Sequence, residues 1–462
     1  MPTMLSREGP MAAVADVDAD GLEDVYIGGA AGQSGQLYLQ KPSGYIRSVQ
    51  PAFALFADFE DVATAFFDAD GDGDPDLMVG SGGNHLPAGV REMQNRLYKN
   101  DGKGVFTLDA NALPQNLGNT SVIAPADYNG DGKIDVFVGS KAVPQQYGAM
   151  PTHYLLRNIG NGRFENQTER DFPGASRLSF VTAAVWANIL GGPQSELIVV
   201  GEWMEPQVFT IKNNALVKVE TNLGGKWGWW QSLAVADLDA DGDNDLVLGN
   251  IGENCYLRPD SLHPVKLWYN DFDGNQLYDK VLTRTIDGKD LPVFLKRDLT
   301  DQIPSLKKQN LKFEAFATKS LQELFSADAV KNSNQYRFDF GSSVVAINQG
   351  NGQFGMMKLP AEAQFSSICA IQVLDANADG KPDLLVGGNQ FAMLPQFGRL
   401  DGSRGNLLLN TGGGVMAWCP PRYSGVDVEG VIKDIKLLPG KKNQFLLLRN
   451  DASPVLLRLK PL

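Results

Sequence analysis

The chain has 462 residues, 43% of them hydrophobic, and its 54 acidic against 41 basic residues give a formal net charge of −13. This acidic balance argues against nucleic acid as a partner, because phosphate binding requires concentrated Lys and Arg. No uninterrupted apolar run approaches the roughly 20 residues of a membrane-spanning helix. Three scattered cysteines, Cys255, Cys369 and Cys419, are too few for a disulfide framework or a zinc site and leave the compartment open.

The N-terminal sequence MPTMLSREGP lacks the basic start, apolar stretch and small-residue cleavage site of a signal peptide. We therefore expect either a cytoplasmic protein or an export signal upstream of Met1. Fifty glycines favour many tight turns over long helices.

An acidic loop begins at Asp16, in ADVDADGLEDVYIGG, and the pattern recurs from Asp68, Asp127, Asp237 and Asp375. Each copy has Asp at positions 1, 5 and 9, Asp or Asn at position 3 and Gly at position 6. A short apolar run ending in Gly follows every copy. Like charges this close repel one another unless a cation holds them, and chance does not produce five such copies.

The loops predict calcium, which takes 6–8 oxygen ligands in flexible geometry. Glycine at position 6 allows the bend that lets position 7 offer its carbonyl and position 9 its carboxylate. Magnesium would keep more water, and transition metals would require His or Cys. A turn without metal is the alternative for a single copy. The predicted ligands are Asp16, Asp18, Asp20, Leu22, Asp24, Asp68, Asp70, Asp72, Asp74, Asp76, Asp127, Asn129, Asp131, Lys133, Asp135, Asp237, Asp239, Asp241, Asp243, Asp245, Asp375, Asn377, Asp379, Lys381 and Asp383.

Short apolar strands flank each loop, such as SLAVAD before and DLVLG after, and further strands such as RLYKN, YLLRN, VVAIN and LLLN lead into Gly turns. Two degenerate copies, near residues 188 and 434, keep the strands without the carboxylates. Four strands per unit at this spacing predict an all-β chain, a seven-bladed β-propeller of four-stranded antiparallel blades in one domain over residues 1–462. The last unit has room for three strands, and the residues before Asp16 are the candidate for its fourth.

The interval from Asp237 to Asp375 spans 138 residues, more than one repeat. It contains DFDGNQLYD, a degenerate acidic loop from Asp271 with Gln276 in place of glycine, which would make a sixth calcium site. The following sequence reads as helical, and Ser320 and Glu323 have the spacing of a capping box. We expect a helical insertion at about residues 297–335, with an eighth, interrupted blade as the alternative.

The acidic repeat resembles the FG-GAP/VCBS repeat of integrin α-chain propellers. The chain is similar, from about residue 10 to its end, to bacterial surface proteins of the ASPIC/UnbV, cartilage-acidic-protein type. The sets from Asp16, Asp68 and Asp237 match the repeat's acidic signature in full, and those from Asp127 and Asp375 match with Asn at position 3. No segment resembles an inserted ligand-binding domain or the ASPIC/UnbV domain itself. The resemblance implies an exported adhesion or scaffolding protein at the cell surface, outside the cell or in the periplasm.

Long loops are predicted on the face opposite the calcium loops, and loops carry function more often than strands. They are residues 82–96, 140–154, 252–264 and 388–405, and they hold His85, His153 and His263, which we expect to be scattered surface residues. The segment GKWGWW places Trp227, Trp229 and Trp230 near the mouth of the central channel, with Phe365 one blade on. These rings would bind a sugar or peptide by stacking, or would simply pack the channel.

No nucleophile elbow, phosphate-binding glycine loop or zinc helix is present in the sequence. Our leading hypothesis is therefore a non-catalytic calcium-binding propeller that binds a protein or glycan at the cell surface. One alternative is a polysaccharide lyase or glycoside hydrolase on the loop face, with Glu202, Asp401 or Glu253 as paired carboxylates. Another is a structural module of a longer surface protein.

Overall fold

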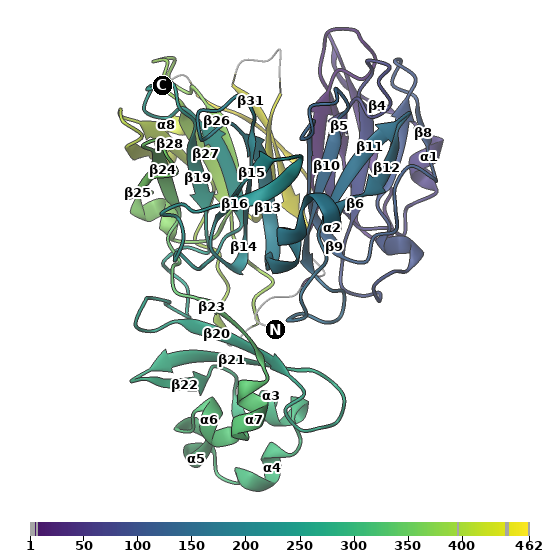
Figure 1. The fold of residues 1–462 in the computed structure, drawn as a ribbon. Coiled ribbons are helices and arrows are strands. Elements are labelled where there is room, and N and C mark those ends of the chain that lie inside the picture. The colour runs from purple at the N-terminus through teal and green to yellow at the C-terminus, as the bar shows by residue number, and fades with distance from the viewer. Residues whose placement is uncertain (1–4, 6–7, 395–396, 439–442, 461–462) are drawn as a thin grey trace.

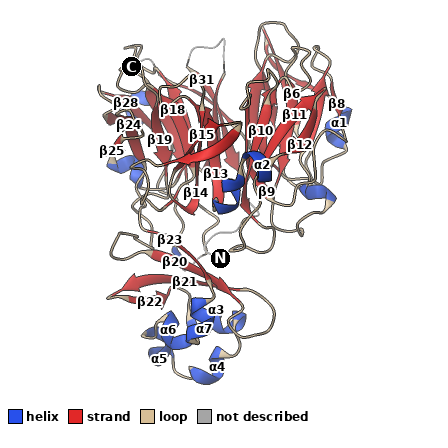
Figure 2. Ribbon diagram, in the orientation of Figure 1, coloured by secondary structure: helices blue, strands red, loops and turns tan. Residues whose placement is uncertain are grey.

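The computed structural model describes residue 5 and residues 8–394, 397–438 and 443–460. Seven antiparallel sheets form a ring, because the first strand of each sheet contacts the first strand of the next and the seventh contacts the first. An eighth sheet lies outside this ring, together with most of the helices (Figures 1 and 2). The predicted all-β propeller fold is confirmed.

Four blades are built from four consecutive strands. Blade 1 contains β1 (Ala12–Ala15), β2 (Asp24–Ile27), β3 (Gln36–Lys41) and β4 (Gly44–Ser48); blade 2 contains β5 (Asp61–Phe67), β6 (Asp76–Ser81), β7 (Arg96–Asn100) and β8 (Phe106–Leu108). Blade 3 contains β9 (Asn119–Ala126), β10 (Asp135–Ala142), β11 (Tyr154–Gly160) and β12 (Arg163–Asn166); blade 6 contains β26 (Ile368–Leu374), β27 (Asp383–Gly388), β28 (Asn406–Asn410) and β29 (Met416–Cys419).

Three blades depart from this plan. Blade 4 contains β13 (Phe180–Ala187), β14 (Glu196–Met204), β15 (Gln207–Lys212), β16 (Ala215–Val219) and the short β17 (Gly228–Trp229), which pairs with β14. Blade 5 contains β18 (Ser232–Ala236), β19 (Asp245–Gly249), β24 (Val344–Asn348) and β25 (Phe354–Lys358). Blade 7 contains only β30 (Val431–Leu437), β31 (Gln444–Asn450) and β32 (Val455–Arg458).

The expectation that the N-terminal segment completes blade 7 is wrong for the described residues. β1 is the inner strand of blade 1, and it begins with the Ala12 N–H donating to Asp434 Oδ2 of β30 at 2.9 Å. The ring is therefore closed by contacts between inner strands, not by a shared sheet.

In five of the seven blades the second strand is buried along its whole length. Every residue of β6, β10, β14, β19 and β27 is buried. This explains their continuous apolar sequences, since both faces of an inner strand pack against neighbouring blades. Outer strands such as β12 are largely exposed and carry polar residues.

The chain leaves blade 5 after β19 and returns at β24, and an insertion fills the interval. It contains β20 (Val265–Asn270), β21 (Asp279–Ile286), β22 (Lys289–Pro292) and β23 (Asn334–Phe338), in the order β22-β21-β20-β23. Between β22 and β23 lie α3 (Lys296–Gln302), α4 (Leu306–Gln309), α5 (Phe313–Ala317), α6 (Leu321–Leu324) and α7 (Ala327–Lys331). The insertion is thus a helical layer on its own sheet.

The predicted helical stretch at 297–335 therefore coincides with α3–α7, but the strands on either side belong to the same unit. The capping box also forms, with the Ser320 N–H donating to Glu323 Oε2 at 2.8 Å. The eighth sheet is not an eighth blade. The strands that precede and follow the insertion, β19 and β24, pair directly with each other in blade 5, so the insertion adds no blade between them. Short helices elsewhere are α1 (Pro51–Ala54), η1 (Arg91–Met93), α2 (Thr168–Asp171), η2 (Pro173–Arg177), η3 (Ala361–Gln364) and α8 (Pro421–Ser424).

The insertion shares a hydrophobic core with one end of the ring. The ring centroids of Trp203 and Trp229 lie 5.2 Å and 5.3 Å from that of Phe338 in β23. Aromatic burial of this kind fixes the insertion to blade 4.

Candidate metal centres and the loop face

Each predicted acidic loop connects the first and second strands of its blade, and the loop from Asp271 connects β20 and β21 in the same way. The backbone turns through the left-handed region at positions 4 and 6 of every loop. In blade 5 these are Ala240 and Gly242, with φ of 66° and 96°. The predicted role of glycine at position 6 is supported, and Gln276 adopts the same conformation with φ of 69°.

The carboxylate at position 1 closes the loop around itself. In blade 2, Asp68 Oδ1 accepts from the Gly71 N–H at 2.7 Å and Oδ2 accepts from the Gly73 N–H at 3.0 Å. The equivalent residues Asp16, Asp127, Asp237, Asp271 and Asp375 make bonds of the same kind. In each of the six loops, the aspartate at position 1 thereby holds the turn.

The carboxylate at position 9 ties the loop to the sheet. Asp76 Oδ2 accepts from the Ala69 N–H at 3.0 Å, and Oδ1 accepts from the Asn100 N–H at 2.8 Å on β7. Burial nevertheless raises the pKa of Asp76 to about 6. A bound cation would oppose that shift, because it favours the ionised form.

In three of the loops the carboxylate at position 3 has a buried oxygen without a hydrogen-bond partner. Asp18 Oδ1, Asp70 Oδ1 and Asp273 Oδ1 are buried and accept no hydrogen bond. Oxygens from positions 1, 3 and 9 lie within 4.8 Å of one another in four loops: Asp16, Asp18, Asp24; Asp68, Asp70, Asp76; Asp237, Asp239, Asp245; and Asp271, Asp273, Asp279. Such an all-oxygen set fits a hard cation, and an orphaned buried oxygen is the feature a metal would satisfy.

Asparagine at position 3 changes the loop in blade 3. Asn129 Nδ2 donates to Asp135 Oδ2 at 2.8 Å, so one oxygen of the position-9 carboxylate already accepts a hydrogen bond from the amide. Burial raises the pKa of Asp135 to about 7. In blade 6, Asn377 instead accepts from the Asp379 N–H at 3.1 Å.

Basic side chains on the third strand reach three of the loops. Lys41 Nζ lies 2.5 Å from both Asp18 Oδ2 and Asp20 Oδ2, and Lys99 Nζ lies 3.1 Å from Asp70 Oδ2. Arg157 reaches the blade 3 loop in the same way. Within the described part of the chain, no ion pair reaches the loop from Asp237 or the loop from Asp271. The loop from Asp237 carries five aspartates against three in the other, so it holds more uncompensated charge.

Sequence reasoning missed an asparagine that links the loops to neighbouring blades. It lies at or near the end of the third strand in four blades: Asn100, Asn158, Asn348 and Asn410. Each Nδ2 donates at 2.7–2.8 Å to a carbonyl at position 2 of the preceding blade's loop, those of Val17, Ala69, Ile189 and Leu238. The signal was present in the sequence, because RLYKN, YLLRN, VVAIN and LLLN all end in Asn.

The opposite end of the ring carries the 2–3 loops and a cavity of about 820 Å³ at the seam of blades 7, 1 and 2. Tyr38, Glu60, His85 and Arg449 line it beside the small residues of the loop after β2. Burial first, and then the nearby Glu8 carboxylate, raises the pKa of Glu60 to about 7. The cavity thus brings aromatic, acidic and hydrogen-bonding groups together from three blades.

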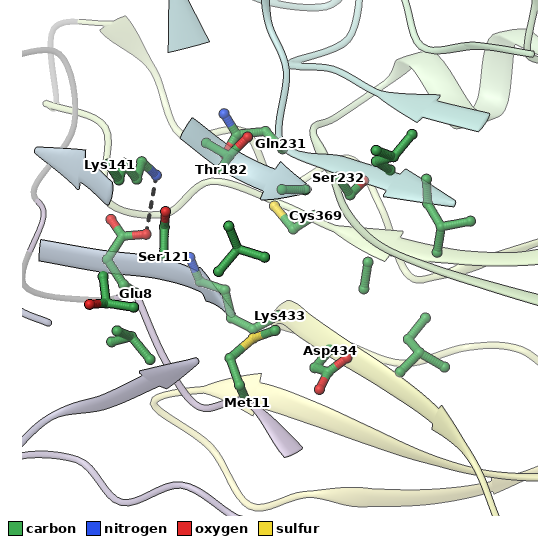
Figure 3. Close-up of a pocket in the computed structure, with 18 of the residues that line it drawn as sticks. Glu8, Met11, Ser121, Lys141, Thr182, Gln231, Ser232, Cys369, Lys433 and Asp434 are labelled. Atoms are coloured by element: carbon green, nitrogen blue, oxygen red, sulfur yellow. Dashed lines mark hydrogen bonds and ion pairs between the residues drawn. The ribbon is translucent and has the colours of Figure 1, made fainter. Parts of the chain in front are cut away.

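A second cavity of about 300 Å³ lies in the central channel, between the inner strands (Figure 3). Ser121, Thr182, Ser232 and Cys369 line it from four different blades. The buried Lys141 ammonium forms ion pairs with Glu8 at 3.1 Å and Glu202 at 3.2 Å. The channel is therefore crossed by a charged network.

The three carboxylates considered as catalytic candidates each have partners of their own. Glu202 is fully buried and also accepts from the Tyr147 hydroxyl at 3.0 Å and from Gln231 Nε2 at 3.2 Å. Glu253 pairs with Lys358 at 2.6 Å, and Asp401 lies 4.0 Å from Arg399. Their surroundings give no support to a shared acid–base site.

Of the two readings of the tryptophans, ligand stacking or packing, burial favours packing for Trp229 and Trp230. Trp229 and Trp230 are 1% and 0% exposed, because the insertion and the blades enclose them. Trp227 is partly exposed beneath Arg337, whose guanidinium lies 5.4 Å from the ring centroid. Exposed aromatic side chains on the loop face are instead Tyr256 and Phe365, at 58% and 48% exposure.

The three histidines have separate environments. His85 is exposed and lines the seam cavity, and His263 pairs with Asp260 at 2.9 Å. His153 is not on the surface as expected: it is buried, accepts from the Ser140 N–H at 3.1 Å and has its pKa lowered to about 4 by burial.

Comparison with protein families gives two matches. A model of the FG-GAP-like repeat matches residues 16–79 and 83–138, and a model of the FG-GAP repeat matches residues 229–259. These segments contain the loops from Asp16, Asp68, Asp127 and Asp237. No curated protein sequence matches the chain.

Three solved structures are similar in outline. The V. cholerae biofilm matrix protein Bap1 is 12% identical over 97% of this chain and 86% of its own, with a TM-score of 0.37. The Dos1 propeller is 10% identical over 97% and 92%, with a TM-score of 0.40. The fucose-specific lectin from Aleuria aurantia is 11% identical over 58% and 72%, with a TM-score of 0.31.

Among the residues that the structure describes, no helix is both long enough and apolar enough to span a bilayer.

Proposed function

Because this chain is an FG-GAP repeat protein folded as a β-propeller, we propose that it is a non-catalytic, calcium-stabilised binding module of the cell surface. Its ligand would be a glycan or a protein held at the loop face. Localisation outside the cell, on its surface or in the periplasm, is part of the same proposal.

The donor chemistry of the loops supports calcium. Oxygens of positions 1, 3, 5 and 9, with the position 7 carbonyl, would supply the ligands in blades 1, 2, 3, 5 and 6. Calcium accommodates such a set, whereas magnesium binds fewer protein oxygens and keeps more water. The observation that carries this part is the buried, unbonded oxygen of Asp18 and of Asp70. Bound calcium would neutralise the clustered carboxylates and fix the hairpin between two strands.

The loop face supports ligand binding. Calcium loops precede the second strands and the seam cavity lies at the other ends of these strands, so the metal would stiffen the scaffold without contacting the ligand. The cavity lies within the 300–1,000 Å³ range of small-molecule sites. Tyr38 offers a ring for stacking, and Glu60, His85 and Arg449 offer polar groups.

A retention assay tests the proposal. The protein is incubated with a polysaccharide panel in calcium, and retained sugar and new reducing ends are measured in the same wells. Retention without cleavage is the expected result, and Tyr38→Ala should reduce it if the seam cavity is the site. Newly formed ends would contradict the non-catalytic proposal. Neither signal would exclude the glycan arm and leave a protein ligand, to be tested by cross-linking to surface proteins, or the role of a structural module.

A further inference from the structure

The far end of the insertion exposes apolar side chains in one place. Leu295, Leu311 and Phe313 are 60%, 83% and 68% exposed, and we call them the tip cluster. Lys296 follows Leu295 in the sequence and contacts the other two residues. Its Nζ donates to the Leu311 carbonyl at 3.0 Å and lies 4.6 Å from the Phe313 ring centroid. In Figure 1 the helices α4 and α5 lie at the end of the insertion away from the ring.

The tip cluster is not part of the insertion's core. The same helices turn Leu299, Leu306 and Phe316 inward, where all three are buried. The helical layer therefore has its apolar interior without Leu295, Leu311 or Phe313. Neighbouring exposed apolar residues of this kind mark interaction surfaces more often than isolated ones do.

Basic residues surround the tip cluster. Residues 295–319 carry six basic and three acidic side chains, within a chain whose net charge is −13. One acid, Asp301, is already paired with Arg297 at 3.7 Å and Lys307 at 3.3 Å. Lys308 and Lys312 are exposed beside the apolar residues. A surface that is both basic and apolar is complementary to an anionic, partly apolar partner.

The charge of the molecule is polarised along its length. The calcium loop of blade 5 lies at the start of β19 and the insertion departs from the end of the same strand, so the acidic loops of the ring and the basic tip lie at opposite ends. The loop from Asp271 is the exception, since it lies within the insertion between β20 and β21. An anionic surface would attract the tip and repel the acidic loops, which gives the molecule one preferred orientation.

We propose that the tip of the insertion binds an anionic lipid surface, with Leu295, Leu311 and Phe313 entering the headgroup region and the surrounding lysines contacting lipid phosphates. A lipid surface fits better than an acidic protein, because the three apolar side chains are 60–83% exposed and a bilayer supplies an apolar phase beneath diffuse negative charge. The inference is independent of the ligand at the loop face, which lies on a different part of the molecule.

Co-sedimentation with vesicles tests this inference. The full chain is mixed with vesicles of phosphatidylcholine containing phosphatidylglycerol, or of phosphatidylcholine alone, in calcium and in chelator. Binding is expected only to the anionic vesicles, and it should weaken with salt. The double variants Lys307→Glu/Lys308→Glu and Leu311→Ser/Phe313→Ser should each lower the affinity about tenfold or more. Lys103→Glu and Leu262→Ser, which alter exposed residues outside the tip, are the matched controls.

Equal binding by wild type and the tip variants, or no binding at low salt, would overturn the inference. A loss with charge reversal but not with Leu311→Ser/Phe313→Ser would also overturn it and indicate an acidic polymer or protein. Dimers that dissociate in the Leu311→Ser/Phe313→Ser variant, seen by light scattering, would assign the surface to a second copy. Melting curves of each variant establish that the ring remains folded.

Discussion

Asn158 Nδ2 donates a hydrogen bond to the carbonyl oxygen of Ala69 at 2.8 Å, across the boundary between blades 3 and 2. The same side chain accepts from the Gly160 N–H at 2.9 Å, so it also fixes the turn after β11. Ala69 is position 2 of an acidic loop. The state of one loop is therefore coupled to the packing of the next blade.

We expect Asn158→Ala to lower the free energy of unfolding by about 2 kcal/mol, because it leaves buried backbone groups without partners. Urea unfolding in calcium measures the effect. The control is Asn111→Ala, at an exposed asparagine in the connection between blades 2 and 3. It should change the free energy of unfolding by less than about 0.5 kcal/mol. Equal effects of the two substitutions would contradict the role assigned to Asn158.

Calcium should raise the melting temperature, because it binds only the folded loops. Asp239→Asn should reduce this rise. The same variant should be at least as stable as wild type in chelator, because burial and the Asp241 carboxylate raise the pKa of Asp239 and no ion pair in the described structure compensates its charge. Scanning calorimetry with and without chelator measures both quantities.

The control is Asp58→Asn, at an exposed aspartate outside the loops, which should leave the calcium effect unchanged. A wild-type melting temperature indifferent to chelator would refute the calcium proposal while leaving the fold intact.

Lys141→Met should destabilise the protein by about 3–5 kcal/mol, since it leaves the fully buried Glu202 carboxylate without its cation. The double variant Lys141→Met/Glu202→Gln should recover part of that loss, because the Glu8 carboxylate still lacks its Lys141 partner. Chemical unfolding of both singles and the double measures the coupling energy. Additive losses would show that the ion pair is not what links the two residues.

His153 predicts a pH dependence. Its folded pKa of about 4 lies below the ordinary value of 6.5, so the unfolded state binds the proton more readily. Stability from this residue is present above about pH 6.5 and is lost progressively toward pH 4, by about 3 kcal/mol in total. Unfolding of wild type and His153→Gln at pH 7.5 and pH 5 isolates the effect, because other groups titrate in both. Equal losses of unfolding free energy between pH 7.5 and pH 5 in the two proteins would show that His153 does not cause the pH dependence.

The acidic loops could be predicted from sequence because the same donor pattern has to recur wherever the same turn is built. The blade count followed from the spacing of those loops, including the degenerate copies near 188 and 434. The strands of the insertion could not be predicted, since segments such as VKLWYN occur once and carry no periodic signal. The burial of Trp229 also depends on contact with Phe338, more than 100 residues away in the chain. The asparagine bonds were missed because their acceptors are backbone carbonyls of another blade.

β19 and β24 are adjacent antiparallel strands, with Leu248 paired to Val344, so the two ends of the insertion leave the ring side by side. A continuous blade 5 would need only a short turn at this point, and the ring's pairing would be unchanged. The strand pairing of the ring therefore does not depend on the insertion, whereas the packing of Trp203 and Trp229 does. Without the insertion, Trp203 and Trp229 would face water. Any lineage that lost it would have to replace these tryptophans, and any that acquired it would gain from keeping them.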